Sequence, residues 1–486
     1  MCIAQWSAGK VWFLGHALVG ASYFFSIALG MILGGLWAAD DQFKPSIIFG
    51  ATLMAASATV GIMLAQLLDV GAGGIWINAK EYGGRPFGNL MQTNNAASII
   101  NLGLLALLWL KDRQYMGRSS LVFCWMFLGF GLVMTGSRIN ILAHFVVIVV
   151  LLWRSRLLGE TRRFGFFALL YLAALLLVSP YVWSYFGLDP ESSMITRTVN
   201  ETRMSIFQAF FAASFAKPLS GYGFGQAQIA QMQAADFGYA LPGTFIWTHN
   251  VFLDLIIWFG YPAFFIFVLA WLVSVMKMNY GLLNRQDWIL VASFMVIALH
   301  AMVELPHGYL FFSLPAAVIW GYLYERAAPP VQHVNSIRMR FWMICMALSG
   351  AFLLISILHD YLEAERSLLA WRMKYHRIGF SHPIDLPDVI MLNQFRGLML
   401  GMWYPVDALD GKALKDFEEA VFLVPSEVGI QKLIRATVES GNPARAQLLV
   451  DRFRLILGKE SRVKLSIAWN AMAQSQPLYR SVSWLP

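Results

Sequence analysis

The chain has 486 residues, of which 58% are hydrophobic and only 13% are charged, and its formal net charge is +8. A soluble domain carries about twice that share of charged residues, so this composition excludes an ordinary soluble protein and predicts a polytopic α-helical membrane protein. Cys2, Cys124 and Cys345 lie far apart and match neither a disulfide framework nor a zinc pattern.

The apolar segments in chain order predict an all-α fold with about ten transmembrane helices. The predicted spans cover roughly 11–37, 46–68, 96–110, 119–135, 139–153, 164–186, 250–276, 288–303, 309–324 and 341–358. Residues 1–358 would then form the transmembrane domain, which includes a long loop over 187–249. Residues 359–486 would form a separate helical domain outside the membrane.

The connections between these spans alternate in positive charge. The loops 111–118, 154–163, 277–287 and 325–340 carry twelve Lys and Arg, whereas the opposite connections 69–95, 187–249 and 304–308 hold only five. The first set is therefore expected in the cytoplasm and the second on the outer face. The same alternation places the amino terminus outside, from which we expect further helices upstream of a shortened start.

The C-terminal residues 359–486 read as amphipathic helices. One begins near Ala413 with Phe417, Ala420 and Val421 on one face, and others cover 427–439 and 443–457. The turn Gly441-Asn442-Pro443 between the last two is similar to tetratricopeptide packing, although one pair does not establish a repeat. This domain is expected to contribute to acceptor binding or regulation, or to act only as a structural cap.

A histidine stands where the polar loop 187–249 ends and an apolar helix begins. His249, followed by Asn250, is expected at a membrane–water boundary, where an imidazole can exchange a proton with a substrate held in the membrane. The alternative is an interfacial histidine that only caps the helix. The segment 217–225, Lys-Pro-Leu-Ser-Gly-Tyr-Gly-Phe-Gly, lacks the strand and the Walker pattern of a nucleotide site and predicts a glycine turn after a helix.

Two arginines in the outward connections are candidate phosphate ligands. Arg203 begins an amphipathic helix that is predicted to carry Phe207, Phe210 and Phe211 on one side, and its planar guanidinium suits phosphate. The alternative is an arginine that anchors a re-entrant helix at the interface. Arg138 lies in a tight turn between two spans. A charged arginine at a membrane edge costs free energy unless it forms an ion pair or binds a substrate.

Further outward candidates carry uncharged amides or a His–Glu pair. Arg85 precedes Gln92, Asn94 and Asn95, whose amides suit sugar hydroxyls or pyrophosphate oxygens, or else cap the next helix. His300 and Glu304 lie one helical turn apart and can pair. We expect no metal site there, because Pro306 should end the helix before His307 and leave at most two ligands on one face.

Outward arginines, amides and one boundary histidine suit an anionic head group attached to a lipid, with a base nearby to activate a hydroxyl. Because the outer loops lack a DxD-like pattern, cationic side chains would have to stabilise a leaving pyrophosphate. The reaction class that this set predicts is glycosyl transfer from a lipid-linked donor.

Five motifs in this order resemble the bacterial superfamily of O-antigen ligases, O-polysaccharide polymerases and protein O-oligosaccharyltransferases. They are Gly88–Asn95, Gly136-Ser-Arg138, Arg203 followed by 217–225, His249-Asn250 with Gly260, and His300–Pro306. The resemblance covers roughly 60–330 and, more loosely, the C-terminal domain. The family's histidine motif ends in Gly, Thr or Val where this chain has Ala263. The Gln-x-Asn-Asn turn, the His-x-x-x-Glu-x-Pro segment and the helical C-terminal domain are most similar to the protein O-oligosaccharyltransferases.

The resemblance implies transfer of an oligosaccharide from undecaprenyl pyrophosphate to a serine or threonine hydroxyl of a periplasmic protein. His249 would act as the base or orient the acceptor, and Arg138 and Arg203 would hold the pyrophosphate. The remaining substrate-binding candidates are Arg85, Gln92, Asn94, Asn95, Asn250, His300 and Glu304. The resemblance implies neither metal nor cofactor, and a multi-pass enzyme of the inner membrane whose active site faces the periplasm.

Alternative acceptors are the lipid A core, for an O-antigen ligase, and a growing polysaccharide, for a polymerase. The expected partners are the lipid-linked donor, the hydroxyl acceptor and membrane lipids, without nucleic acid. A lipid-linked glycan transporter is a weaker alternative, because the hydropathy shows neither inverted repeats nor broken helices. A non-catalytic membrane scaffold is the other class, in which the outward arginines would be dispensable.

Overall fold

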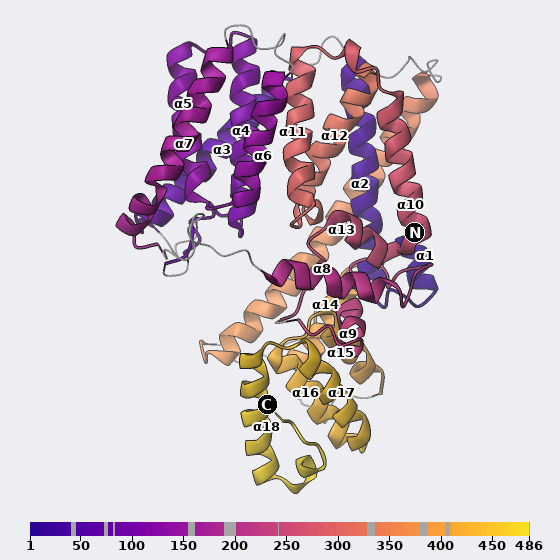
Figure 1. Cartoon of the computed structure of the whole chain (residues 1–486). Coiled ribbons are helices and arrows are strands. Elements are labelled where there is room, and N and C mark those ends of the chain that lie inside the picture. The colour runs from indigo at the N-terminus through magenta and orange to yellow at the C-terminus, as the bar shows by residue number, and fades with distance from the viewer. Residues whose placement is uncertain are drawn as a thin grey trace. The chain divides into compact units, whose positions relative to one another are not determined.

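The computed structural model describes residues 1–39, 45–71, 76–80, 83–153, 161–188, 201–241, 243–327, 336–379, 386–403, 409 and 411–485. These residues fold into helices without a strand among them, which confirms the all-α class (Figure 1). The helices are α1 (Cys2–Ser7), α2 (Leu14–Ala39), α3 (Ser46–Leu67), α4 (Thr93–Asp112), α5 (Arg118–Met134), α6 (Arg138–Trp153), α7 (Thr161–Tyr185), α8 (Glu201–Ser214), α9 (Ala227–Asp236), α10 (Val251–Lys277), α11 (Arg285–Ala301), α12 (Leu310–Ala327), α13 (Ser336–Tyr375), α14 (Asn393–Trp403), α15 (Gly411–Leu423), α16 (Glu427–Glu439), α17 (Pro443–Ile456) and α18 (Lys459–Ser475). Short 3₁₀ turns cover Tyr280–Leu282, Pro306–Gly308 and Pro477–Ser481.

Each of the ten predicted spans falls on a helix, from α2 to α7 and from α10 to α13. Within the described residues, five helices are long and apolar enough to cross a membrane, namely α2, α3, α4, α7 and α10. The helices α5 and α6 are apolar but shorter. The total of ten spans stays a prediction. So does the domain boundary after residue 358, a position that lies inside the continuous helix α13.

The chain divides into two compact units. The first unit contains Met1–Ser26, Glu201–Trp271 and Gln332–Pro486, and the second contains Ile27–Asn200 and Leu272–Val331. Every candidate residue therefore belongs to one unit or the other.

The second unit is built around α4, which packs against α3, α5 and α11. Small residues let these helices approach closely: a Cβ added to Gly103 of α4 would lie 2.3 Å from the Ala56 Cβ of α3. Ile100, Leu104 and Leu128 are fully or almost fully buried in the same cluster. This packing fixes the registers of the helices that carry Asn94, Arg138 and His300.

The first unit contains the segment around His249 and the C-terminal helices. The predicted turn at Gly441-Asn442-Pro443 is confirmed, because Gly441 has φ +82°, the Asn442 side chain accepts from the Arg445 amide at 3.2 Å, and Pro443 begins α17. The predicted face of α15 is also confirmed, since Phe417, Ala420 and Val421 are each 1% exposed. Helices α15 and α17 both contact α9.

The structure corrects two expectations about the first unit. The predicted span 250–276 is broken at Gly260, whose φ of +79° and ψ of 173° are non-helical, so α10 consists of two helical segments. On α8, Phe210 is fully buried whereas Phe211 is 51% exposed, so the three phenylalanines do not share one side. Successive residues of a helix point about 100° apart, which separates neighbours such as Phe210 and Phe211.

Candidate functional site

The sequence candidates are distributed over both compact units. Arg203, His249 and Asn250 lie in the first unit, and Arg85, Gln92, Asn94, Asn95, Arg138, His300 and Glu304 lie in the second. Their convergence on one substrate stays a prediction. Within each unit the described side chains have definite partners.

A buried polar network centred on Asn140 of α6 joins three helices of the second unit. The Asn140 side-chain amide donates to the Asn94 carbonyl and to Ser137 Oγ, both at 3.0 Å. The Asn101 side chain donates to the Asn140 carbonyl at 2.9 Å. Ser98 Oγ donates to Asn140 Oδ1 at 2.7 Å. Asn140 therefore uses both its donor and its acceptor group, which fixes the orientation of its amide.

This network also fixes the proton on one candidate, His300 of α11. Because the only hydroxyl proton of Ser98 lies on the bond to Asn140, the 2.8 Å contact between Ser98 Oγ and His300 Nδ1 requires Nδ1 to be the donor. The neutral imidazole of His300 therefore carries its proton on Nδ1 and its lone pair on Nε2. His300 is 1% exposed, so this hydrogen bond holds the ring within the helical core.

Glu304 bonds to Asn94 in the turn that follows α11. The Asn94 side chain donates to Glu304 Oε1 at 2.9 Å, and Glu304 is 7% exposed. Although α11 ends at Ala301, the Glu304 amide donates to the His300 carbonyl at 3.0 Å, so the two residues lie one helical turn apart as predicted, while the Glu304 carboxylate bonds to Asn94. Leu305 before Pro306 has φ −113° and ψ 36°, which is not helical, and Pro306 begins a 3₁₀ turn, so the helix ends before His307 as predicted.

The other two amide candidates retain buried oxygens without partners. Asn95 donates from its side-chain nitrogen to the Leu90 carbonyl at 3.3 Å, while Asn95 Oδ1 and Gln92 Oε1 have no hydrogen-bond partner in the described part of the chain. The proposed capping role is wrong for Asn94 and Asn95, since α4 begins at Thr93 with Gln92 at the N-cap position. Both oxygens can accept hydrogen bonds only.

Arg85 supports the turn that carries Arg138. Its Nη1 donates to the carbonyls of Thr135 and Gly136, each at 3.2 Å. The predicted tight turn is confirmed, because α5 ends at Met134 and α6 begins at Arg138. Arg138 is half-buried at the N-terminus of α6. Arg85 thus contributes to the position of Arg138 through the backbone of the turn.

In the first unit, His249 lies in the left-handed region, with φ +61°. The following residue, Asn250, caps α10: its Oδ1 accepts from the Phe252 and Leu253 amides at 3.0 and 3.1 Å. The Thr248 amide donates to the buried carboxylate of Asp254 at 2.9 Å. Asn250, and not His249, therefore caps α10. Hydrogen bonds of Thr248 and of Asn250 fix the turn before and after His249.

The imidazole of His249 also has a defined tautomer. Its Nδ1 lies 3.1 Å from the Trp247 carbonyl oxygen, which can only accept, so Nδ1 is the donor. The neutral ring then carries its lone pair on Nε2. The ring is half-buried and lies edge-on to Phe245, with ring centroids 5.8 Å apart.

The break in α10 is filled by the glycine turn that the sequence predicts after α8. Tyr222 donates its amide to the Ile257 carbonyl at 2.7 Å, and Gly223 donates to the Trp258 carbonyl at 3.2 Å. A Cβ on Gly221 would lie 2.6 Å from the Ile257 oxygen. This turn therefore supplies amide donors to α10 carbonyls just before the break.

Arg203 lies in the first turn of α8, half-buried, and α8 packs against α9.

Four members of the buried network were not predicted from the sequence: Ser98, Asn101, Asn140 and His144, whose Nδ1 lies 2.9 Å from Asn101 Oδ1. The signal that could have found them is the recurrence of polar residues at helical spacing, 94, 98 and 101 on α4 and 140 and 144 on α6. No group of three or more potential metal-binding side chains occurs among the described residues.

The chain matches two protein families. Residues 121–268 match the O-antigen ligase family, and residues 288–466 match the C-terminal region of the virulence factor membrane-bound polymerases. It is 24% identical over 326 residues to a ComP-specific O-oligosaccharyltransferase of Acinetobacter baylyi, covering 66% of this chain and 58% of the relative. It is 24% identical over 381 residues to a general O-oligosaccharyltransferase of the same organism, covering 74% of this chain and 64% of the relative.

The chain thus spans about three fifths of the length of these relatives. The two family matches follow one another along the chain, one from α5 to α10 and one from α11 to α18. The chain is thus similar to the O-antigen ligases over 121–268 and, over a longer stretch, to O-oligosaccharyltransferases.

Proposed function

We propose that this protein transfers a glycan from undecaprenyl pyrophosphate to a serine or threonine hydroxyl of a protein, at the periplasmic face of the bacterial inner membrane. Both relatives named above are O-oligosaccharyltransferases, which supports a protein acceptor. The donor, the acceptor residue and the orientation in the membrane are parts of this proposal.

The observation that carries the proposal is the geometry of His249. A non-glycine residue at φ +61° is strained by about 1–2 kcal/mol, and such strain is commonly retained where it serves a site. The Trp247 carbonyl fixes the proton on Nδ1, so the neutral ring carries its lone pair on Nε2, the tautomer of a general base. In this mechanism Nε2 accepts the proton of the acceptor hydroxyl as its oxygen attacks the anomeric carbon.

The bond between that carbon and the pyrophosphate oxygen then breaks, and the electron pair leaves with undecaprenyl pyrophosphate. Arg138 and Arg203 are proposed to bind the pyrophosphate, because a guanidinium forms two parallel hydrogen bonds to phosphate oxygens. Cationic side chains would stabilise the leaving group without a metal ion.

The buried oxygens of Gln92 and Asn95 suit the sugar part of the donor. An amide oxygen accepts from a sugar hydroxyl but repels a phosphate oxygen. We therefore assign these two residues to the glycan and not to the pyrophosphate. Asn94, His300 and Glu304 would hold the α4 and α11 ends of the same region, because Asn94 bonds to Glu304 and His300 bonds to Ser98.

The test reconstitutes the purified protein in proteoliposomes with an undecaprenyl-pyrophosphate-linked glycan and candidate acceptor proteins. Wild type is compared with His249→Ala and Arg203→Ala, and His359→Gln serves as the control because its side chain is 62% exposed on α13. We expect transfer to protein by wild type and the control, and at least about a hundredfold loss in the two site variants.

Full transfer by both site variants would exclude the mechanism. Product on the lipid A core without product on protein would assign the chain to the O-antigen ligases. A ladder of extended polysaccharide would assign it to the polymerases. The last two outcomes change the acceptor while the donor stays the same.

A further inference from the structure

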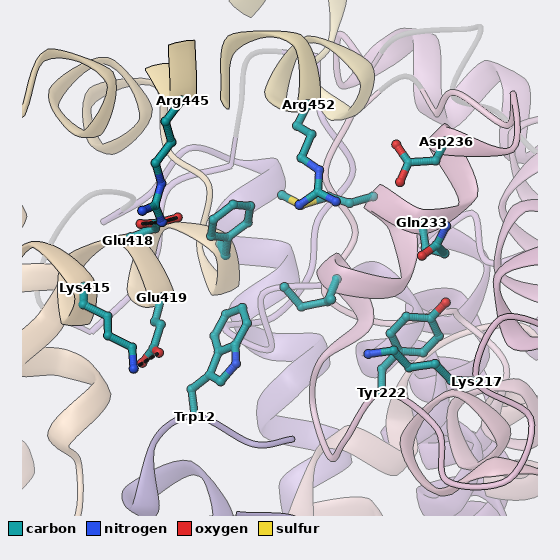
Figure 2. Close-up of a pocket in the computed structure, with 13 residues that line it drawn as sticks. Trp12, Lys217, Tyr222, Gln233, Asp236, Lys415, Glu418, Glu419, Arg445 and Arg452 are labelled. Carbon is teal, nitrogen blue, oxygen red and sulfur yellow. Dashed lines mark hydrogen bonds and ion pairs between the residues drawn. The ribbon is translucent and has the colours of Figure 1, made fainter. Parts of the chain in front are cut away.

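A cavity of about 400 Å³ lies within the first unit, between the N-terminal segment, α9, α15 and α17 (Figure 2). Its apolar part is formed by Trp12, Ile229, Met232 and Phe422. Trp12 meets Phe422 edge-to-face, with ring centroids 6.2 Å apart. This surface can receive one aromatic or aliphatic side chain of a ligand.

The charges around the cavity are of two kinds. Arg445 pairs with Glu418 at 2.7 Å, and Lys415 lies 3.9 Å from Glu419, so these four charges largely compensate each other. Figure 2 shows both pairs on the same side of Trp12.

Three further charges line the opposite part of the cavity. Lys217, Arg452 and Asp236 form no ion pair within 4 Å in the described part of the chain. Two cations against one carboxylate leave this part of the cavity with an excess of positive charge. A ligand that brings a carboxylate would complement it.

Two opposing effects act on the charge of Lys217. Its Nζ lies 4.8 Å from the centroid of the Tyr222 ring, a cation–π contact that favours the charge. Burial, and to a smaller extent the charge of Lys10, lowers the pKa of Lys217. An incoming carboxylate would favour the protonated lysine, so binding of an acidic ligand would relieve this unfavourable arrangement.

The wall of the cavity is connected to the turn that carries His249. Gln231 of α9, adjacent to the lining residue Met232, donates to the Gly243 carbonyl at 2.6 Å and accepts from the Phe245 amide at 2.8 Å. The Phe245 ring in turn contacts the His249 imidazole. A ligand in the cavity would therefore bind next to the element that positions the proposed base.

We propose that this cavity is a docking subsite for the acceptor polypeptide, which places an apolar or aromatic side chain against Trp12 and an acidic residue between Lys217 and Arg452. This inference rests on the proposed function. A polypeptide is favoured over a glycan because the cavity combines its apolar part with an excess of positive charge. Amide side chains, which suit sugar hydroxyls, are represented among the lining residues by Gln233 alone.

The test measures binding of two fluorescein-labelled decapeptides to the purified full chain in detergent, by fluorescence anisotropy and without donor lipid. Each peptide has one Phe, one Ser and six Gly or Ala, and the remaining two residues are Asp in one peptide and Lys in the other. The variants are Arg452→Glu, Asp236→Lys and the control Lys459→Glu, which reverses an exposed charge at the start of α18, outside the cavity.

We expect the Asp peptide to bind wild type more tightly than the Lys peptide. Arg452→Glu should weaken binding of the Asp peptide by about tenfold, Asp236→Lys should strengthen it, and Lys459→Glu should leave it unchanged. The Lys peptide should show the opposite order. In the transfer assay, Arg452→Glu should raise the acceptor KM and leave kcat unchanged, because the charge acts on docking.

Effects of opposite sign cannot result from a general folding defect. Equal affinity for both peptides, or equal weakening by Arg452→Glu and Lys459→Glu, would overturn the subsite. If a soluble oligosaccharide competes with the Asp peptide for wild type, and Arg452→Glu abolishes this competition, the ligand of the cavity is a glycan and not a polypeptide. Binding is measured without donor lipid and is therefore independent of glycan transfer. If the protein binds the Asp peptide in a charge-dependent way but transfers no glycan, the proposed function is contradicted and the subsite is not.

Discussion

The Tyr261 amide donates a 2.7 Å hydrogen bond to the Pro218 carbonyl, directly after the break in α10. This bond fixes the start of the second helical segment to a chain segment some forty residues earlier. Gly260 lies between the two segments with φ +79° and ψ 173°, a conformation that essentially only glycine adopts. The path of α10 through the break therefore depends on a tertiary contact as well as on its own sequence.

Gly260→Ala should destabilise the protein by about 2–4 kcal/mol, because the backbone conformation is strained for alanine and the added Cβ would lie 2.6 Å from the Leu219 carbonyl carbon. Thermal unfolding in detergent measures the effect. The control is Gly61→Ala in α3, where a Cβ meets nothing within 4 Å and which should be neutral or slightly stabilising. Equal melting temperatures for the two variants would contradict the assigned break.

Substitutions at His249 should separate backbone strain from chemistry. His249→Gly fits φ +61°, so its unfolding free energy should stay within about 1 kcal/mol of wild type while glycan transfer is lost. His249→Val should lose transfer and also stability, by roughly 1–2 kcal/mol, because a β-branched residue is strained in that region. Thermal unfolding and the proteoliposome assay give the two readouts. Wild-type transfer by His249→Gly would remove His249 from the mechanism.

Features determined by neighbouring residues could be predicted from the sequence. Gly441, Asn442 and Pro443 specify a helix end, a cap and a helix start over three positions, and the structure has all three. The turn before Arg138 and the apolar helices follow from equally local patterns. The existence of most helices could therefore be read from the chain.

Features determined by distant residues could not be predicted from the sequence. The break at Gly260 has no signal in hydropathy, since the residues on both sides are apolar and the cause is the Pro218–Gly223 segment. The spacing of the polar residues on α4 and on α6 indicates a polar face on each helix, but only the packing of α4 against α6 shows the hydrogen bond between Ser98 and Asn140. The placement of Arg203 and Arg138 around one substrate has the same long-range character and stays a prediction.

Asn140→Asp tests the buried network with an almost isosteric change. The carboxylate would still accept from Ser98, but an oxygen would replace the donor to the Asn94 carbonyl and Ser137 Oγ. We expect a loss of about 2–3 kcal/mol in unfolding free energy, since buried groups lose their donor. Thermal unfolding of the full chain is the measurement.

The matched control is Asn284→Asp, in the same unit. Asn284 caps α11 through its oxygen, which accepts from the Gln286 and Asp287 amides, and aspartate caps equally well. Its stability should therefore remain within about 1 kcal/mol of wild type. A loss at Asn284→Asp as large as at Asn140→Asp would show that the loss at Asn140 does not depend on its amide donor.

Lys432 of α16 should make the stability of the C-terminal helices depend on alkaline pH. Burial, and to a smaller extent the charge of Arg435, lowers the pKa of Lys432 from 10.5 to about 8. Between these two values the unfolded chain binds more protons than the folded one, so stability should rise as pH increases from about 8 to 10.5. Below pH 8 the folded protein carries a partly buried charge that opposes folding.

Lys432→Met should therefore remove this rise and stabilise the protein at pH 7 by roughly 1 kcal/mol, a value reduced for the solvent that screens a half-exposed group. The pH dependence is followed by thermal unfolding of the full chain from pH 7 to 10.5, with the buried Trp469 and Trp484 as fluorescent reporters. Lys459→Met, at an exposed position, is the control and should follow wild type. A Lys432→Met profile parallel to that of wild type would show that this lysine does not couple protonation to folding.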